Sequence, residues 1–270
     1  MSCPAFRLGY SHPNLRPDAT GFSPWYETPS QNNPAPSSPT PPKLPLVTTP
    51  EPLPNNLGPT RLQQIYDSTA TFYDSVVAQH QARAKELAIE LLARQPGERF
   101  LEIGCGTAWA LSRIVAASGA ANAAGIDVSP GMLAVARDCL LSDAAIANPP
   151  LLVADARALP FANASFDCAL TTYTLEVLPS DDIAAVLRDC VRVLRPGGRL
   201  VIVNLTEGEG ADAAISDEWK RGYLADPEYY SGSRPLVLSP FMDAAGLTLQ
   251  TRRYSGHGDS WPSEILLATR

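Results

Sequence analysis

The stretch "LEIGCGT" combines an acid and two glycines in an order that suits ligand binding. Gly104 and Gly106 are separated by one residue, and glycines let a backbone approach a ligand closely because they carry no side chain. Glu102 lies two residues before the first glycine, where a carboxylate would repel a diphosphate and attract a cationic amino group or a sulfonium. The spacing therefore favours a ligand that carries a positive charge.

Two more acids follow apolar runs further along the chain. Asp127 ends "AAGID", where a carboxylate can accept both hydroxyl groups of a ribose, and Asp155 ends "LLVAD". Thr172 and Tyr173 end the next apolar run. If these runs are parallel strands, their carboxyl ends lie at one edge of a sheet, and one crevice gathers all four residues.

The elements needed for this arrangement alternate along the sequence. Short apolar runs predict strands, and apolar residues at helical spacing predict the helices between them. Ser129 followed by Pro130 is a helix start, because the serine caps the free N–H groups and the proline fits the first turn. We expect helices over 60–95, 107–118, 129–140, 180–194 and 235–246, and strands over 99–103, 123–128, 151–156, 166–174, 199–205, 247–255 and 263–270. Such alternation predicts an α/β fold: a doubly wound, Rossmann-like, mostly parallel seven-stranded sheet with helices on both faces.

Composition divides the 270-residue chain in two. Residues 1–59 hold 15 of the 26 prolines and lack a periodic apolar pattern, so we predict a disordered proline-rich tail followed by one domain over 60–270. The tail is interpreted as a linker, a targeting extension or a segment that docks to a proline-reading domain.

Charge and cysteine content limit the partners. A formal net charge of −7 and a pI near 5.0 disfavour nucleic acid, which usually requires a basic face. The five cysteines form no metal-binding pattern and no disulfide framework, so we expect no metal and a cytoplasmic location, with import into an organelle left open. No apolar run is long enough to span a membrane.

Two cofactors compete for the crevice. A dinucleotide fingerprint has a third glycine at the position of Trp109, and this sequence lacks it. The order acid, glycine, glycine, with further acids after the second and third strands, favours S-adenosylmethionine instead.

Four motifs carry a family resemblance: "LEIGCGTAWAL", "GIDVSPGMLAVAR", "ADARALPFANASFDCAL" and "VLRPGGRLVIVN". In order and spacing they resemble the class I S-adenosylmethionine-dependent methyltransferases. "YDSTATFYD" and "TYTLEVLP" are similar to the ubiquinone/menaquinone-biosynthesis methyltransferase-like (methyltransferase type 11) group, which acts on quinones, lipids, sterols and other small molecules. The resemblance covers 60–270 and implies an antiparallel final strand.

The resemblance also implies a role for each matching residue. The cofactor's methionine part would lie among Glu102, Gly104 and Gly106, its ribose at Asp127, its adenine at Asp155, and its sulfonium beside Thr172 and Tyr173. The remaining cofactor-binding residues that it implies are Cys105, Thr107, Val128, Met132, Ala156, Tyr66 and Tyr73, the two tyrosines as parts of a lid. Ala108 and Trp109 depart from the family, which commonly has small residues there.

Catalytic groups are less clearly marked than cofactor-binding ones. A sulfonium is already an activated methyl donor, so alignment and exclusion of water are the main demands on the protein. His257 and Tyr173 are candidate bases, and Trp219, Tyr223, Tyr229 and Tyr230 in the loop 206–233 are candidates to line an acceptor pocket. We therefore expect methylation of a small-molecule acceptor, quinone-like, lipid-like or another metabolite. The alternatives are an NAD(P)-dependent oxidoreductase and a non-catalytic cofactor-binding regulator.

Overall fold

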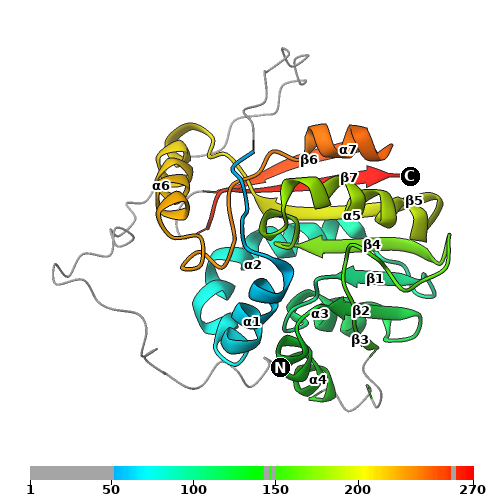
Figure 1. Cartoon of the computed structure of the whole chain (residues 1–270). Coiled ribbons are helices and arrows are strands. Elements are labelled where there is room, and N and C mark those ends of the chain that lie inside the picture. The colour runs from blue at the N-terminus through cyan, green and yellow to red at the C-terminus, as the bar shows by residue number, and fades with distance from the viewer. Residues whose placement is uncertain (1–51, 143–145, 147–149, 257–259) are drawn as a thin grey trace, which may run out of the picture. The chain divides into compact units, whose positions relative to one another are not determined.

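The described residues of the computed structural model are 52–142, 146, 150–256 and 260–270. They form a seven-stranded sheet in the order β3-β2-β1-β4-β5-β7-β6 (Figure 1). Strands β1 to β5 run parallel, and β7 pairs antiparallel with both β5 and β6. The strands are β1 Phe100–Ile103, β2 Ala123–Asp127, β3 Leu151–Val153, β4 Phe166–Thr172, β5 Leu194–Leu205, β6 Thr248–Ser255 and β7 Ser263–Thr269. The predicted fold class is confirmed, including the antiparallel final strand.

Helices cover both faces of the sheet. Helices α2, α3 and α4 lie on one face of the sheet, and α5 and α7 lie on the other (Figure 1). Their apolar side chains form two separate core clusters, one on each face. The helices are α1 Pro59–Thr69, α2 Tyr73–Leu92, α3 Trp109–Ser118, α4 Pro130–Leu141, α5 Ser180–Val193, α6 Ala213–Ala225 and α7 Ser239–Ala245, with short 3-10 turns η2 Leu175–Val177 and η3 Gly210–Asp212.

Strand β1 shows how alternation places a polar group inside. Phe100 packs on the α2–α3 face, while Leu101 and Ile103 pack on the α5 face. Successive side chains of a strand point to opposite faces, so Glu102 shares the face of Phe100. All four residues of β1 are buried, as expected for a central parallel strand.

The helices differ from expectation in four places. The expected helix over 60–95 is two helices, α1 and α2, which a turn at Ala70–Phe72 separates. The loop expected over 206–233 contains α6, in which Ile215, Trp219 and Tyr223 recur at helical spacing. The expected 235–246 helix is confined to Ser239–Ala245, and Leu194 begins β5 rather than ending α5.

Residues 52–58 lie against the domain as extended chain. The buried Arg234 guanidinium donates through Nε to the Leu53 carbonyl at 2.6 Å, and Tyr223 donates to the Pro54 carbonyl at 3.0 Å. Asn55 donates through Nδ2 to the Val177 carbonyl at 2.5 Å. We call residues 53–55 the strap; they lie on the tail side of the predicted boundary at residue 60 and bond to the domain.

Candidate active site

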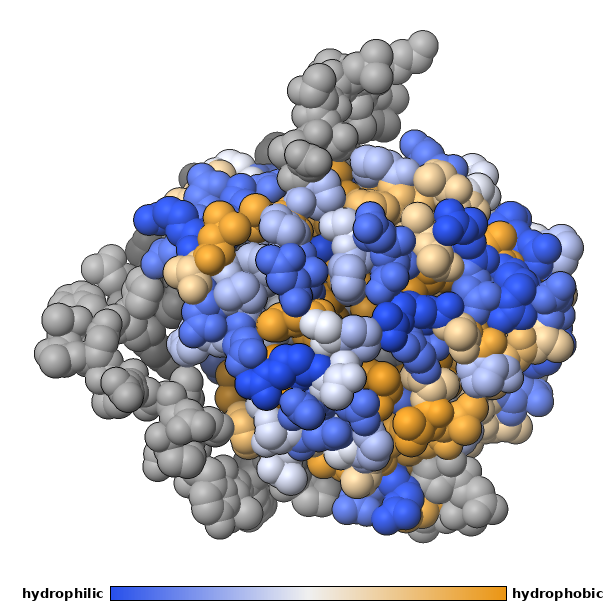
Figure 2. Space-filling view, in the orientation of Figure 1, coloured by the Kyte–Doolittle hydropathy of each residue, from blue (hydrophilic) through white to orange (hydrophobic). Residues whose placement is uncertain are grey.

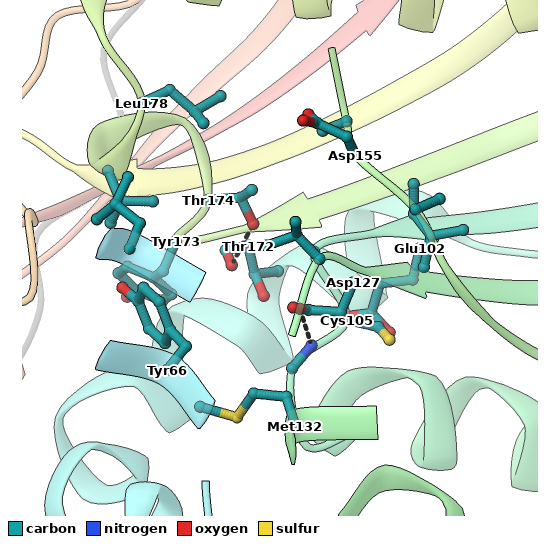
Figure 3. Close-up of a pocket in the computed structure, with 18 of the residues that line it drawn as sticks. Tyr66, Glu102, Cys105, Asp127, Met132, Asp155, Thr172, Tyr173, Thr174 and Leu178 are labelled. Atoms are coloured by element: carbon teal, nitrogen blue, oxygen red, sulfur yellow. Dashed lines mark hydrogen bonds between the residues drawn. The ribbon is translucent and has the colours of Figure 1, made fainter. Parts of the chain in front are cut away.

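A cleft opens where β1, β2, β3 and β4 end, and it encloses about 1030 Å³ of empty space that includes open solvent (Figure 3). All thirteen residues predicted to bind the cofactor line this cleft: Tyr66, Tyr73, Glu102, Gly104, Cys105, Gly106, Thr107, Asp127, Val128, Met132, Asp155, Ala156 and Thr172. Tyr173 lines it as well. His257, the other candidate base, lies outside the described residues.

The glycine loop after β1 needs its glycines for two different reasons. Gly104 has a φ of +67°, and a Cβ there would lie 2.2 Å from Thr174 Oγ1, so the loop packs against the end of β4. Gly106 has a φ of +53°, and a Cβ there would meet no atom. Left-handed backbone and an open side facing the cleft suit a loop that presents its backbone to a ligand.

Asp127 joins the glycine loop to the loop that follows β2. Its Oδ2 accepts a hydrogen bond from Gly106 N at 2.9 Å, and its Oδ1 accepts one from Ser129 N at 2.9 Å. Burial raises the pKa of this carboxyl, while the two backbone bonds oppose the increase. The two bonds fix the carboxylate at the edge of the cleft, where Figure 3 shows it beside Cys105.

Glu102 lies beneath this loop with only 1 % of its surface exposed. Burial raises the pKa of its carboxyl to about 8, although the positive charge of Lys85 opposes the shift. Its Oε2 makes no well-formed hydrogen bond with the described residues. A buried carboxyl with a free oxygen is suited to accept a hydrogen bond from a cationic ligand.

Lys85 is a lining residue that sequence reasoning missed. It lies on the buried face of α2, and its ammonium is 5.7 Å from the ring centres of both Trp109 and Tyr173. Burial lowers the pKa of the ammonium, and the described residues offer it no hydrogen bond or ion pair. The sequence signal was a lysine at helical spacing among the small apolar residues Ala84, Ala88 and Leu92.

Asp155 already has a partner in the cleft. Arg157 Nε donates to both of its oxygens at 3.0 Å, and Arg157 also reaches Asp182 at 3.3 Å. The Arg157 hydrogen bond lowers the pKa of Asp155, so the carboxylate stays ionised. Arg157 and Asp182 both line the cleft, and neither was predicted from the sequence.

Tyr173 adopts a left-handed backbone conformation, with a φ of +54°, directly after β4. A bulky residue in this region stores strain, which is most often found at functional sites. Its hydroxyl is hydrogen-bonded to Ser263 Oγ at 2.8 Å, and burial raises its pKa far above the ordinary value. The phenol therefore stays protonated and is poorly suited to accept a proton.

Helices α1 and α2 cover one side of the cleft. Tyr66 comes from α1 and Tyr73 from the first residue of α2, and their ring centres lie 6.1 Å apart. Pro59 and Leu62 of α1 face the cleft together with Val177 and Leu178, so this mouth is mainly apolar.

Trp109 also lines the cleft, at the position where a dinucleotide fingerprint has glycine. The Arg113 guanidinium lies 3.5 Å from the centre of its ring. Ala108 has a φ of +64°, a conformation that glycine adopts without strain, which explains why a small residue is usual there.

The four aromatic residues expected to line an acceptor pocket do not reach this cleft. Trp219 packs against Trp261 and Tyr230, and its indole donates to the Ser233 carbonyl at 2.8 Å. Tyr223 is buried and holds the strap, whereas Tyr229 is 67 % exposed.

In the part of the chain that the structure describes, no helix is long and apolar enough to cross a membrane. Within the same residues, no three His, Cys, Asp or Glu side chains are grouped as a metal site would require.

Comparison with known proteins agrees with the fold. Residues 100–198 match a family described as "Methyltransferase domain". Together with the strand order and the glycine loop, this match identifies residues 100–198 as a methyltransferase domain of the class I, S-adenosylmethionine-dependent type. S-adenosylmethionine is the methyl donor of this class.

Two curated relatives illustrate the sequence similarity. The chain is 33 % identical over 162 residues to the "Ubiquinone/menaquinone biosynthesis C-methyltransferase UbiE" of Pseudomonas putida. The aligned residues make up 57 % of this chain and 62 % of the relative. It is 33 % identical over 157 residues to a "2-phytyl-1,4-naphtoquinone methyltransferase" of Synechococcus elongatus, covering 55 % and 65 %. The chain thus spans less than two thirds of each relative's length.

Solved structures share the fold. The "[4+2]-Cyclase SpnF" superposes with a TM-score of 0.62 at 19 % identity, covering 78 % of this chain and 95 % of that one. Geranyl diphosphate C-methyltransferase from Streptomyces coelicolor A3(2) gives 0.54 at 11 % identity, covering 70 % and 77 %. Since a cyclase and a methyltransferase share this architecture, the fold alone does not decide the acceptor or the reaction.

Figure 2 shows the polar and apolar residues mixed over the face of the domain that it displays.

Proposed function

We propose that this protein transfers a methyl group from S-adenosylmethionine to a small-molecule acceptor with an apolar body. The observation that carries the proposal is the convergence of the glycine loop, Asp127 and the buried Glu102 on one cleft. The curated relatives that act on quinones support the choice of a small organic acceptor.

The residues present fit the cofactor. The free oxygen of Glu102 suits its ammonium group, and the unpaired Lys85 ammonium suits its carboxylate. Asp127 would accept the ribose hydroxyls, because its oxygens retain lone pairs beyond the two backbone bonds. Asp155 and the Ala156 backbone would meet the adenine edge, while Val128 and Met132 would pack on the adenine ring.

The bound cofactor supplies an activated methyl group, so the protein's tasks are alignment and exclusion of water. Tyr66 and Tyr73 would cover the bound cofactor and exclude water, and both phenols stay protonated because burial raises their pKa values. Thr172 and Tyr173, at the end of β4, would border the reacting centre. The apolar mouth at Pro59, Leu62, Val177 and Leu178 would hold the body of the acceptor.

The formal net charge of −7 supports a partner other than nucleic acid, and a cytoplasmic location stays a prediction from cysteine usage.

Calorimetric titration with S-adenosylhomocysteine tests the cofactor placement. Asp127→Ala should weaken binding on the order of tenfold or more, because charge-assisted hydrogen bonds are lost. Asp138→Ala removes an exposed acid of α4 and serves as the matched control, with unchanged affinity expected. Equal affinity for all three proteins would contradict the placement of the ribose at Asp127.

A further inference from the structure

The sequence pair Tyr-Asp occurs twice in the helices that cover the cleft. Tyr66 and Asp67 lie near the end of α1, and Tyr73 and Asp74 begin α2. Both tyrosines line the cleft, whereas neither aspartate does. We call α1, α2 and the turn between them the α1–α2 hairpin.

Asp67 bonds to the loop that follows β2. Its Oδ1 accepts hydrogen bonds from Ser129 Oγ at 2.5 Å and from Gly131 N at 2.9 Å. Gly131 permits this approach, because a Cβ there would lie 3.0 Å from the Asp67 Cα. Ser129 caps α4 through its side chain and also donates its backbone N–H to Asp127. Ser129 therefore connects Asp67 to Asp127, the carboxylate proposed to hold the ribose.

Asp74 bonds to the glycine loop after β1, so the two aspartates contact the two loops that would hold the cofactor. Its Oδ1 accepts a hydrogen bond from Thr107 Oγ1 at 2.9 Å, and Thr107 is buried. Thr107 directly follows Gly106, whose backbone N–H donates to Asp127 Oδ2. Asp127 thus connects Gly106 with Ser129, while Asp67 bonds to Ser129 itself and Asp74 bonds to the residue next to Gly106.

We propose that Asp67 and Asp74 are positioning residues, which couple closure of the α1–α2 hairpin to the geometry of both cofactor loops. The inference rests on the proposed function. Each Tyr-Asp pair acts as one unit: the aspartate fixes the hairpin to a cofactor loop, and the preceding tyrosine is thereby placed over the cleft. Coupling between two sites is reciprocal, so cofactor binding steadies the hairpin and the docked hairpin tightens cofactor binding.

Other contacts keep the hairpin attached when one aspartate is removed. Arg61 of α1 forms a two-pronged ion pair with Glu228, and Tyr66 donates to the Ser231 carbonyl at 3.3 Å. The Asp67→Ala and Asp74→Ala variants should therefore fold.

Two measurements on the full chain test the coupling. Hydrogen exchange of the ligand-free protein should show faster exchange across α1 and the first turn of α2 in both variants. Calorimetry should show binding of S-adenosylhomocysteine weakened on the order of tenfold in each, because a hydrogen bond to a charged group is lost. The double variant should lose less than the product of the two effects, since both bonds hold one hairpin.

Matched controls separate coupling from a general loss of stability. Ser68→Ala and Glu86→Ala change exposed residues of α1 and α2 and should leave exchange and affinity unchanged. Asp67→Asn and Asp74→Asn keep the accepting oxygen and should restore affinity to within about threefold of wild type.

Each outcome decides a different point. A lower melting temperature in the alanine variants with unchanged affinity would overturn the proposal, because the aspartates would then be structural only. Unchanged hairpin exchange would overturn it as well. A wild-type protein that binds no S-adenosylhomocysteine would refute the proposed function, while the exchange measurement would still decide whether the aspartates hold the hairpin.

Discussion

A buried carboxyl beside an unpaired lysine makes the charge of the cleft dependent on its ligand. With a pKa of about 8, Glu102 is mostly protonated at pH 7 in the free protein. A cation placed beside it favours the ionised form and lowers that pKa.

Binding of S-adenosylmethionine at pH 7 should therefore release up to about one proton. Calorimetry in phosphate and in Tris measures this release, because the two buffers differ in their heat of ionisation. Glu102→Gln should abolish the difference between the buffers, and Glu86→Gln should preserve it. Equal heats for the wild type would contradict a cation next to Glu102.

For single residues, the sequence predicted those whose position depends on the strand next to them in the chain. Gly104 and Gly106 lie in the loop that follows β1, and Asp127 ends β2, so their place at the edge of the sheet is set by the chain itself. Lys85 and Arg157 were missed, because one reaches the cleft from a distant helix and the other through an ion pair. Packing in three dimensions decides such positions, and the spacing of residues does not encode it.

Among the elements, those with strong local signals were predicted best. Ser129 caps α4 by accepting a hydrogen bond from Met132 N at 3.0 Å, as the sequence indicates. Helix α6 was missed although Ile215, Trp219 and Tyr223 recur at a spacing of four residues, because the segment was interpreted as a loop.

The strap gives a prediction for truncated chains. A chain that begins at Pro52 should keep the melting temperature of the full protein, since the proline-rich segment before it is expected to add no core. A chain that begins at Thr60 should lose about 2–3 kcal/mol of unfolding free energy, because buried Arg234 and Tyr223 lose acceptors in the strap. Urea unfolding measures the difference, and equal midpoints for the two chains would show that the strap adds nothing.

For the molecule as a whole, the alternation of strands and helices was enough to predict the doubly wound sheet. General rules of chain connection limit the crossovers between the parallel strands, but the strand order β3-β2-β1-β4-β5-β7-β6 was not predicted from the sequence. The α1–α2 hairpin over the cleft does not follow from those rules, because it depends on contacts such as Asp67 with Gly131.

Stability of the ligand-free protein should fall as the pH rises from about 5 to 8. Glu102 and Glu176 are both buried, and burial raises the pKa of each from the ordinary value near 4.5 to about 8. Between these values the folded state holds more protons than the unfolded state, so raising the pH favours unfolding by at most about 1.4 kcal/mol per pH unit for each carboxyl.

Urea unfolding at pH 5, 6, 7 and 8 measures this slope. Glu102→Gln and Glu176→Gln should each flatten it, whereas Glu86→Gln should not, because Glu86 is exposed. Glu98 affects stability in the opposite direction, because its hydrogen bond with Arg199 lowers its pKa to about 2. The stability that Glu98 contributes is lost as the pH falls from about 4.5 towards 2. Identical slopes for wild type and both buried-site variants would show that these carboxyls are not buried as described.

The most direct test of the central claim is a thermal-shift titration of the full chain with S-adenosylmethionine, S-adenosylhomocysteine, NAD and NADP side by side. A ligand at 100 times its Kd adds about 2.7 kcal/mol to the unfolding free energy, which is enough for a clear rise in Tm. Stabilisation by the two adenosyl ligands alone is the predicted result. Stabilisation by a nicotinamide dinucleotide alone, or by none of the four, would contradict the account.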